Sequence, residues 1–379
     1  MIRDLTDDEA RVALAAKWGM APEGVLPAWI AEMDYAPAEC ITEALTDAVR
    51  AGALGYPRFE SGGPLGEAYA GFAQRHFGLR IEPDHVRPVV DVTAGVRLLL
   101  DVLSGPGAMV MPVPAYSPQL AIAEVSGRKR VDLLVDADAP RAELDLDELD
   151  RLLADGAQTL LLTQPHNPWG RVFTRAELEG VRDVVVRHRA RVISDEIHAP
   201  LVLPGAEYVS YLDLDGTADH AVALVAASKA FNTAGLKCAQ LVVPDDATRA
   251  RLEEVPMARN DSWSSLGVVA SIAAYTHGDP WLAALIERLD AQRTLLGTLL
   301  AEHLPEARMR PLEATYLAWI DLRAYGHEQP AAVALERGRV WVSEGDDYHR
   351  GLPGHVRLNI ATSPARLTDA IERLATALA

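Results

Sequence analysis

The chain has 379 residues, of which 49% are hydrophobic and 24% charged, as expected of a soluble globular protein large enough for more than one core. Its net charge of −18 argues against binding to nucleic acid or to an anionic membrane through a general basic surface. The apolar runs fall short of the roughly 18 residues that span a bilayer, and the acidic N-terminal segment is unlike a secretory signal, so we expect a cytoplasmic protein.

The N-terminal part of the chain is predicted to contain two helices and one apolar segment. Residues 7–18 form an acid-rich, helix-like stretch, and residues 29–35 form an apolar segment that carries Asp34. Residues 40–51 have helical periodicity and lead into a Gly-Tyr-Pro turn at Tyr56. Both Asp34 and Tyr56 also have an ordinary structural interpretation, the first in a strand and turn that pack on a small domain, the second as a turn residue.

A candidate phosphate site follows at the start of the next helix. Residues 89–92 predict a strand, and Thr93, Ala94 and Gly95 lead directly into a helix over 96–103. Free backbone N–H groups and the positive dipole end of a helix can hold a phosphate, and a small residue allows close approach. As an isolated turn, this Thr-Ala-Gly sequence would be uninformative. Residues 109–112 predict the next strand, which ends shortly before Tyr116.

Three polar residues follow three further predicted strands. Asn167 lies after the apolar run 159–162, Asp195 ends a strand that begins at residue 191, and Lys229 follows the run 221–225. In an open α/β sheet, the carboxyl ends of the parallel strands form the edge where ligands bind. A lysine desolvated at that edge is suited to covalent catalysis, because burial favours the neutral amine. Taken alone, the Ser228-Lys229 pair is equally compatible with a surface lysine beside a turn.

The remaining segments predict connecting helices and a second, smaller unit. Helices are expected from residue 145 and over 174–189, 268–274 and 364–378, and leucines at helical intervals from residue 279 predict a long helix between two domains. Residues 315–322 and 339–342 predict strands, and the polar loop 260–265 could face a neighbouring subunit. Cys40 and Cys238 have no metal-ligand spacing and are too few for a disulfide framework, so we expect two buried thiols and no metal site.

Several of these segments together resemble one enzyme family. The ordered set Pro-His-Asn-Pro (165–168), Ser-Asp-Glu-Ile-His (194–198) and Ser-Lys-Ala-Phe-Asn (228–232) is similar to the pyridoxal-phosphate (PLP) enzymes of fold type I, within the aminotransferase class I/II superfamily. The residues of these motifs look most like those of the MalY/PatB group of cystathionine β-lyases. The resemblance runs from Trp-Ile-Ala-Glu-Met-Asp (29–34) to His-Val-Arg-Leu-Asn (355–359).

The resemblance implies an α/β fold of the fold-type I PLP-dependent transferase kind, with a mainly parallel central sheet flanked by helices and a smaller α+β domain. Residues 1–40 would contribute to the small domain and the active-site entrance, residues 41–285 would form the large PLP-binding domain, and residues 286–379 the small C-terminal domain. It also implies a homodimer with composite active sites and a small-molecule amino-acid substrate, with no nucleic acid or membrane partner.

The resemblance further assigns catalytic roles. Lys229 would hold PLP covalently and act as the base, and Asp195 would pair with the pyridine nitrogen and keep it protonated. Asn167 would hydrogen-bond the phenolic oxygen and contact substrate. His198 stands where many aminotransferases have a tyrosine with a shared role, although a structural histidine is the alternative. Arg357 would bind the substrate α-carboxylate, because its planar fork can pair with both oxygens.

The remaining implied contacts surround the cofactor and the entrance. Tyr116 would stack on the pyridine ring and line the substrate site, and Asp34 would lie at the entrance and contribute to substrate binding. Tyr56 would reach the phosphate of the neighbouring subunit's cofactor. Lys237 stands eight positions after Lys229, where related aminotransferases place a phosphate-binding cation, although members of this group also use other residues. The loop 93–95 and Ser228 would complete the cofactor contacts.

These assignments predict a PLP-dependent carbon–sulfur β-lyase that cleaves cystathionine or another S-substituted cysteine to a thiol, pyruvate and ammonia. A class I/II aminotransferase is the alternative, because the same residues serve both reactions.

Two segments differ from the residues that are typical of the family: residues 345–350, expected at the rim of the substrate site, and the Glu-Ala-Thr-Tyr sequence at 313–316. They motivate a third reading, a specialised enzyme acting on a cysteine S-conjugate by β-elimination or by decarboxylation with oxidative deamination, as in lincosamide biosynthesis. A mainly regulatory binding protein, as one MalY-type relative suggests, would not need the full cofactor set.

Overall fold

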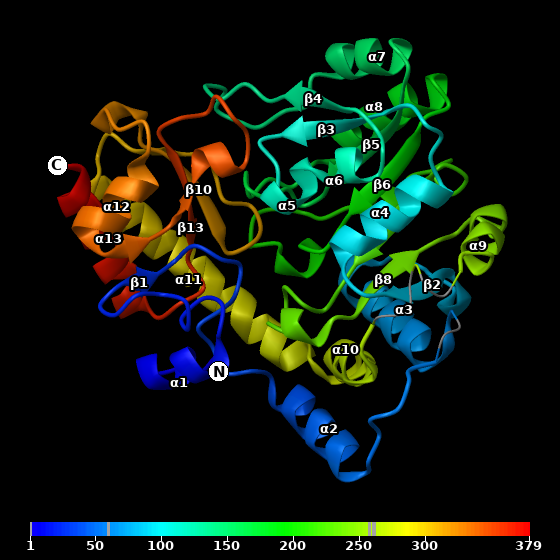
Figure 1. Ribbon diagram of the computed structural model, residues 1–379, viewed down its shortest axis with the longest axis horizontal. Coiled ribbons are helices and arrows are strands. Elements are labelled where there is room, and N and C mark those ends of the chain that lie inside the picture. Colours follow the sequence, from blue (N-terminus) through cyan, green and yellow to red (C-terminus); the bar gives the residue numbers. More distant parts are fainter. Residues whose placement is uncertain (1, 59–60, 257–258, 260–262) are drawn as a thin grey trace.

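The computed structural model describes residues 2–58, 61–256, 259 and 263–379 of the chain. Its centre is a seven-stranded sheet in the right half of Figure 1. The strands lie in the order β2 (Val86–Val89), β8 (Ala239–Val242), β7 (Ala221–Val225), β6 (Arg191–Asp195), β5 (Ala157–Thr163), β3 (Ala108–Val113) and β4 (Arg130–Leu134). Strand β8 runs antiparallel to both neighbours, and the other pairs are parallel.

Helices cover both faces of this sheet because successive side chains of its strands alternate between two apolar cores. In β3, Met109 and Met111 pack with α4 (Val92–Val102), whereas Val110 packs with α7 (Leu146–Ala154) and α8 (Arg175–Arg187). Further helices belonging to this half are α2 (Glu39–Arg50), α3 (Gly63–Phe77), α5 (Ser117–Leu120), α6 (Ile122–Val125), α9 (Asp246–Glu253) and α10 (Ser265–His277).

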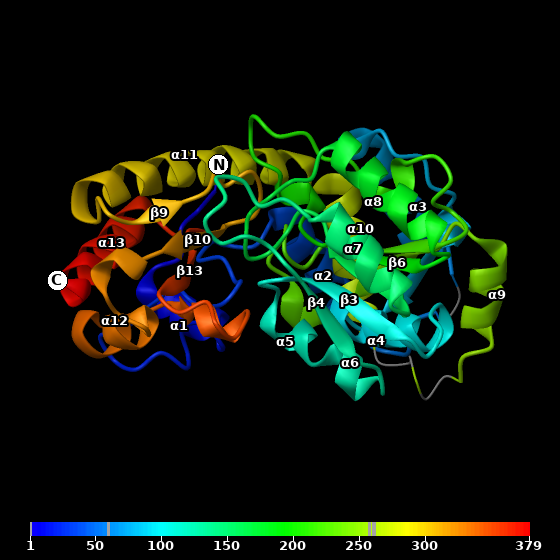
Figure 2. The same cartoon turned by 90° about the horizontal axis from the view of Figure 1, so that it is seen from above.

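A smaller antiparallel sheet occupies the other half of the molecule (Figures 1 and 2). Its order is β12 (Ser343–Glu344), β13 (His355–Asn359), β10 (Leu317–Asp321) and β9 (Arg308–Met309), and it packs with α12 (Pro330–Gly338) and α13 (Pro364–Leu378). Helix α11 (Asp279–His303) runs along both halves in Figure 2. The N-terminal segment joins the smaller half, because β1 (Leu26–Pro27) pairs with β11 (Val340–Trp341).

The predicted α/β class with a mainly parallel sheet is confirmed, and several element boundaries agree closely with the predictions. Strand β7 spans 221–225 as predicted, and α8 begins after Thr174, whose side chain forms a capping box with Glu177. Two boundaries were wrong. The strand predicted over 89–92 ends at Val89, because Asp91 caps α4, and the first helix, α1 (Asp7–Ala13), ends well before residue 18. Among the described residues, no helix is long and apolar enough to cross a membrane.

Candidate active site

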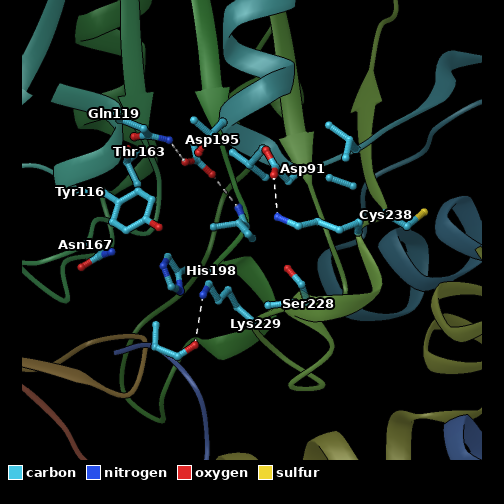
Figure 3. Close-up of a pocket in the computed structure, with 18 residues that line it drawn as sticks. Asp91, Tyr116, Gln119, Thr163, Asn167, Asp195, His198, Ser228, Lys229 and Cys238 are labelled. Carbon is cyan, nitrogen blue, oxygen red and sulfur yellow. Dashed lines mark hydrogen bonds and ion pairs between the residues drawn. The ribbon is translucent and has the colours of Figure 1, made fainter. Parts of the chain in front are cut away.

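Parallel pairing of β5, β6 and β7 brings the three predicted strand-end residues to one edge of the sheet. Thr163 pairs in register with Asp195, and Asp195 pairs with Leu224, so the loops that carry Asn167 and Lys229 leave the sheet on either side of Asp195. Asn167, Asp195 and Lys229 all line one pocket (Figure 3). The structure therefore brings together the residues that the sequence placed at separate strand ends.

Lys229 lies at the base of this pocket, in the loop after β7. Its Nζ atom donates a hydrogen bond to the carbonyl oxygen of Ala31, at 3.1 Å. Burial, aided by the nearby positive charge of Arg357, lowers the pKa of Lys229 to about 8. A substantial fraction of the amine is therefore neutral near physiological pH, which a nucleophile and a base both require.

Asp195 is 4% exposed and has no ion-pair partner within hydrogen-bonding range among the described residues. Gln119 Nε2 donates to its Oδ2 at 2.7 Å, and the Ile197 backbone N–H donates to its Oδ1 at 3.2 Å. Burial raises the pKa of Asp195 to about 6, although the hydrogen bond from Gln119 opposes that rise. Sequence reasoning missed Gln119, whose only signal is its position in the short helix directly after Tyr116.

The predicted phosphate site contains an acidic side chain as well as a cation, which the sequence did not lead us to expect. Thr93, Ser228 and Lys237 line the pocket, as predicted for cofactor contacts. Lys237 Nζ lies 3.0 Å from Asp91 Oδ2, so part of its charge is already balanced. The other oxygen of Asp91 accepts a hydrogen bond from the Ala94 backbone N–H at 2.8 Å. Asp91 is a further pocket residue that sequence reasoning missed, although an aspartate before an apolar helix is a recognisable N-cap signal.

Ala94 and Gly95 do not line the pocket, which corrects part of the predicted phosphate loop. A Cβ atom at Gly95 would lie 2.4 Å from Leu224 Cδ2, a separation that side chains do not tolerate. Gly95 therefore allows α4 to pack closely on β7. The part of this helix start that faces the pocket is Asp91, Val92 and Thr93.

The opposite side of the pocket is formed by Tyr116, Asn167 and His198. Arg357 Nη1 donates to Asn167 Oδ1 at 3.1 Å, and its Nη2 donates to the Trp29 carbonyl at 2.8 Å. Its guanidinium also lies over the Tyr348 ring, 4.8 Å from the centroid. Arg357 is buried and does not itself line the pocket, but its hydrogen bond to Asn167 reaches the pocket wall.

His198 is a neutral side chain in this environment. Burial, aided by the neighbouring positive charge of Lys229, lowers its pKa to about 3. Its Nδ1 atom is buried and has no hydrogen-bond partner among the described residues. A buried polar atom without a partner at a pocket wall is a candidate contact for a bound molecule.

Two further predicted site residues, Asp34 and Tyr56, also lie outside the pocket lining. Asp34 is 1% exposed, and it pairs with the buried Lys17 Nζ at 2.8 Å and accepts a hydrogen bond from Trp18 Nε1 at 2.7 Å. These contacts correct its prediction as a substrate-binding residue, because its side chain is directed into the N-terminal segment. Tyr56 is 92% exposed and remote from the pocket lining. Of the loop 260–265 predicted to face a neighbouring subunit, residues 260–262 lie outside the described residues.

The donor set of the pocket fits PLP. The buried carboxylate of Asp195 lacks a cationic partner and suits a protonated ring nitrogen, and Lys229 offers an amine of lowered pKa. Lys237 with Ser228 and Thr93 provides a cation and hydroxyl groups for a phosphate, and Asn167 and His198 can reach a phenolic oxygen. Within the described ranges, no group of three or more histidine, cysteine or acidic side chains is placed to hold a metal ion.

Both cysteines are free thiols, as predicted, and only one of them is fully buried. Cys238 lines the pocket, and burial raises its pKa to about 11, so the thiol is protonated at neutral pH. Cys40 is partly exposed on α2.

Comparisons with known proteins agree with this site. The family model for aminotransferase class I and II matches residues 30–374. A cystathionine β-lyase of Corynebacterium glutamicum is 34% identical, with 98% of each chain covered, and the cystathionine β-lyase PatB of Bacillus subtilis is 32% identical, with 96% of each covered. The solved structure of cystalysin from Treponema denticola, which contains a PLP cofactor, covers 100% of this chain and 99% of its own with a TM-score of 0.93 and 25% identity.

Proposed function

The chain belongs to the aminotransferase class I and II family, and on that premise we propose that it is a PLP-dependent carbon–sulfur β-lyase that converts cystathionine or another S-substituted cysteine to a thiol, pyruvate and ammonia. The observation that carries the proposal is the joint placement of Lys229 and Asp195 in one pocket, in a chain that matches cystathionine β-lyases over nearly its whole length. The predicted similarity to the MalY/PatB group is confirmed by PatB itself.

PLP, when bound, withdraws electrons from the substrate Cα and makes its proton acidic. The chain's residues supply the remaining requirements. Arg357 would bind the α-carboxylate, and its existing hydrogen bond to Asn167 connects it to the pocket wall. Lys229 would take the proton from Cα, because an amine with a pKa of about 8 is an effective base near neutral pH. Departure of the thiolate from Cβ then completes the elimination.

Asp195 has an electrostatic role in this proposal. Its carboxylate would stabilise a positive charge on the ring nitrogen, and the hydrogen bond from Gln119 holds the carboxylate in place. Burial excludes water from this pair and so strengthens their interaction. Neutral His198 cannot add a competing positive charge, and it retains a ring nitrogen for a hydrogen bond.

An aminotransferase is the second candidate, because the family model that matches the chain carries that activity in its name. The two reactions diverge after the Cα proton is removed. A lyase would release the sulfur group of the substrate as a thiol, whereas an aminotransferase would leave the carbon–sulfur bond intact, pass the amino group to the cofactor and release the substrate as a keto acid. Measuring thiol and pyruvate released from cystathionine in the absence of a keto-acid acceptor separates them.

We also propose the domain and subunit arrangement that the family resemblance implies. Residues 41–285 would form the PLP-binding domain, with 286–379 as the small domain and 1–40 contributing to it. The exposed Tyr56, close to the exposed Leu54 and Val49, supports a homodimer in which Tyr56 reaches the partner's cofactor phosphate. Sedimentation of the purified protein would test the dimer. The two free thiols are consistent with a reducing, cytoplasmic environment.

A further inference from the structure

The segment 29–34 is an irregular stretch of backbone that passes over Lys229, and side chains from distant parts of the chain hold it. Irregular backbone that is largely buried must find hydrogen-bond partners outside itself. Its carbonyl groups accept from these side chains in order: Trp29 from Arg357 and Ser343, Ile30 from Asn359, Ala31 from Lys229 and Tyr316, Glu32 from Asn359 and Lys17, and Met33 from Asn232.

Asn232 binds this segment through both the oxygen and the nitrogen of its side-chain amide. The Met33 backbone N–H donates to Asn232 Oδ1, and Asn232 Nδ2 donates to the Met33 carbonyl, both at 2.9 Å. The contact joins residues 199 positions apart and reproduces the pairing that a neighbouring strand would provide. Asn232 has a φ of 57°, a conformation that asparagine tolerates better than most residues.

The small-domain side of the segment is held by a second asparagine. Asn359 Nδ2 donates to the carbonyls of Ile30 and Glu32, each at 2.7 Å, and its Oδ1 accepts from the Ala361 backbone N–H. Asn359 follows Arg357 on β13, whereas Asn232 lies three residues after Lys229. The segment is therefore fixed between the arginine strand and the lysine loop by two matching amides.

We propose that Asn232 is a positioning residue: it fixes segment 29–34 over the lysine loop so that the Ala31 carbonyl holds the amine of Lys229 in place and water is kept from it. Tyr316 supports the same carbonyl, because its hydroxyl donates to Ala31 at 3.1 Å. This role rests on the proposed function, because Lys229 is the residue proposed to remove the Cα proton. It also gives the asparagine of the Ser-Lys-Ala-Phe-Asn motif a role, because Asn232 pairs with the Met33 backbone.

Removing the amide of Asn232 should alter Lys229 without direct contact between the two side chains. Once the segment is free to move, water reaches the amine and relieves the desolvation that lowers its pKa. The other charged groups acting on Lys229 are Arg357, Glu32, Asp195 and Lys237. Of these, only Glu32 lies on the freed segment, and its influence on the pKa of Lys229 is smaller than that of burial. The titration of Lys229 should therefore shift above its value of about 8.

The test uses Asn232→Gly, because glycine removes the amide and still accepts the positive φ. In full-length protein freed of cofactor, hydrogen exchange of the peptide covering residues 26–35 should rise, and the pH dependence of Lys229 modification by an amine reagent should move upward. In the holoenzyme, kcat should fall by about 10- to 100-fold, as for a misplaced catalytic group, with a smaller change in KM. Thr233→Ala is the matched control, since the Thr233 side chain makes no hydrogen bond in the described structure, and it should leave all three readouts unchanged.

If Asn232→Gly fails to fold, Asn232→Asp replaces it. This variant keeps an acceptor for the Met33 N–H but places an oxygen against the Met33 carbonyl, so peptide exchange should again rise and kcat should again fall. Its new carboxylate would itself raise the pKa of Lys229, so exchange is the deciding readout for this variant. Unchanged peptide exchange, or increased exchange with an unchanged Lys229 titration, would overturn the proposal. Exchange and titration need no turnover, so they decide this inference even if the protein proves not to be a β-lyase.

Discussion

Arg357 and Asn167 are joined by a hydrogen bond of 3.1 Å from Nη1 to Oδ1, although they lie 190 residues apart and belong to different halves of the molecule. The bond connects the residue proposed to bind the substrate carboxylate with the residue proposed to contact the cofactor oxygen. Arg357 also donates to the Trp29 carbonyl, so it is held in place before any ligand arrives. A carboxylate therefore meets an arginine whose orientation is already fixed, which reduces the entropy lost on binding.

Replacing Arg357 with lysine should therefore damage substrate binding even though the charge is kept. Lysine cannot donate to Asn167, to Trp29 and to a carboxylate with the geometry of a guanidinium. We expect kcat/KM to fall by about 10- to 100-fold, the effect of losing a charge-assisted hydrogen bond, mainly through KM. Arg323→Lys, in a half-exposed ion pair of the small domain, is the control and should behave as wild type. Equal kinetics for the two variants would remove Arg357 from the substrate site.

Asp195→Asn should retain the fold and the hydrogen-bonding shape of the side chain while removing its negative charge. The buried amide would no longer stabilise a positive ring nitrogen, so we expect kcat to fall by about 10²- to 10³-fold. The absorption spectrum of the bound cofactor should also shift, because the ring nitrogen loses its proton. A variant with a normal spectrum and normal turnover would show that Asp195 does not act on the cofactor.

The lowered pKa of Lys229 predicts a specific pH dependence of stability in the cofactor-free protein. Between about 8, the folded value, and 10.5, the ordinary value, the unfolded state binds more protons than the folded state. The free energy of unfolding should therefore rise with pH across this window because of Lys229. Lys229→Met should lack this contribution, so wild type minus variant stability, measured by urea unfolding, should increase from pH 8 to 10.5. A flat difference would mean that Lys229 is not desolvated in the folded state.

The Lys17–Asp34 pair should matter for stability and leave substrate choice unchanged. Both side chains are buried, so Lys17→Met removes the near cation of Asp34 and leaves only Arg366, whose Nη1 lies 3.9 Å from Asp34 Oδ2; we expect a loss of about 3 kcal/mol in the free energy of unfolding. Arg3→Met is the comparison, because Arg3 and Glu9 are 60% and 44% exposed and their pair should contribute less than about 1 kcal/mol. A changed preference among S-substituted cysteines in the Lys17 variant, at unchanged stability, would restore the entrance role predicted for Asp34.

The residues at strand ends were predictable because their signal is local. Asn167, Asp195 and Lys229 each follow an apolar run, and parallel pairing then aligns the ends of those runs. Gln119 and Ala31 carried no such signal. Gln119 reaches Asp195 across 76 residues of sequence, and Ala31 contributes a backbone carbonyl, which no side-chain pattern reveals.

The errors have the same origin in tertiary contacts. Asp34 sits in a family-like motif, but the burial of Lys17 and Trp18 beside it draws its carboxylate away from the pocket. Gly95 looks like a phosphate-loop glycine, yet the side chain of Leu224 on β7 accounts for it. Such contacts join segments far apart in the sequence, so local patterns could not have identified them.

The most direct test of the proposed function is to mix the purified protein, with PLP bound, with cystathionine and with simpler S-alkyl cysteines. Thiol, pyruvate and ammonia are then measured while the cofactor spectrum is recorded, and Lys229→Ala serves as the inactive control. The proposed β-lyase releases thiol and pyruvate in equal amounts, and the spectrum returns to its starting form after each turnover. Conversion of the cofactor to its amine form without release of thiol would contradict the proposal and identify an aminotransferase.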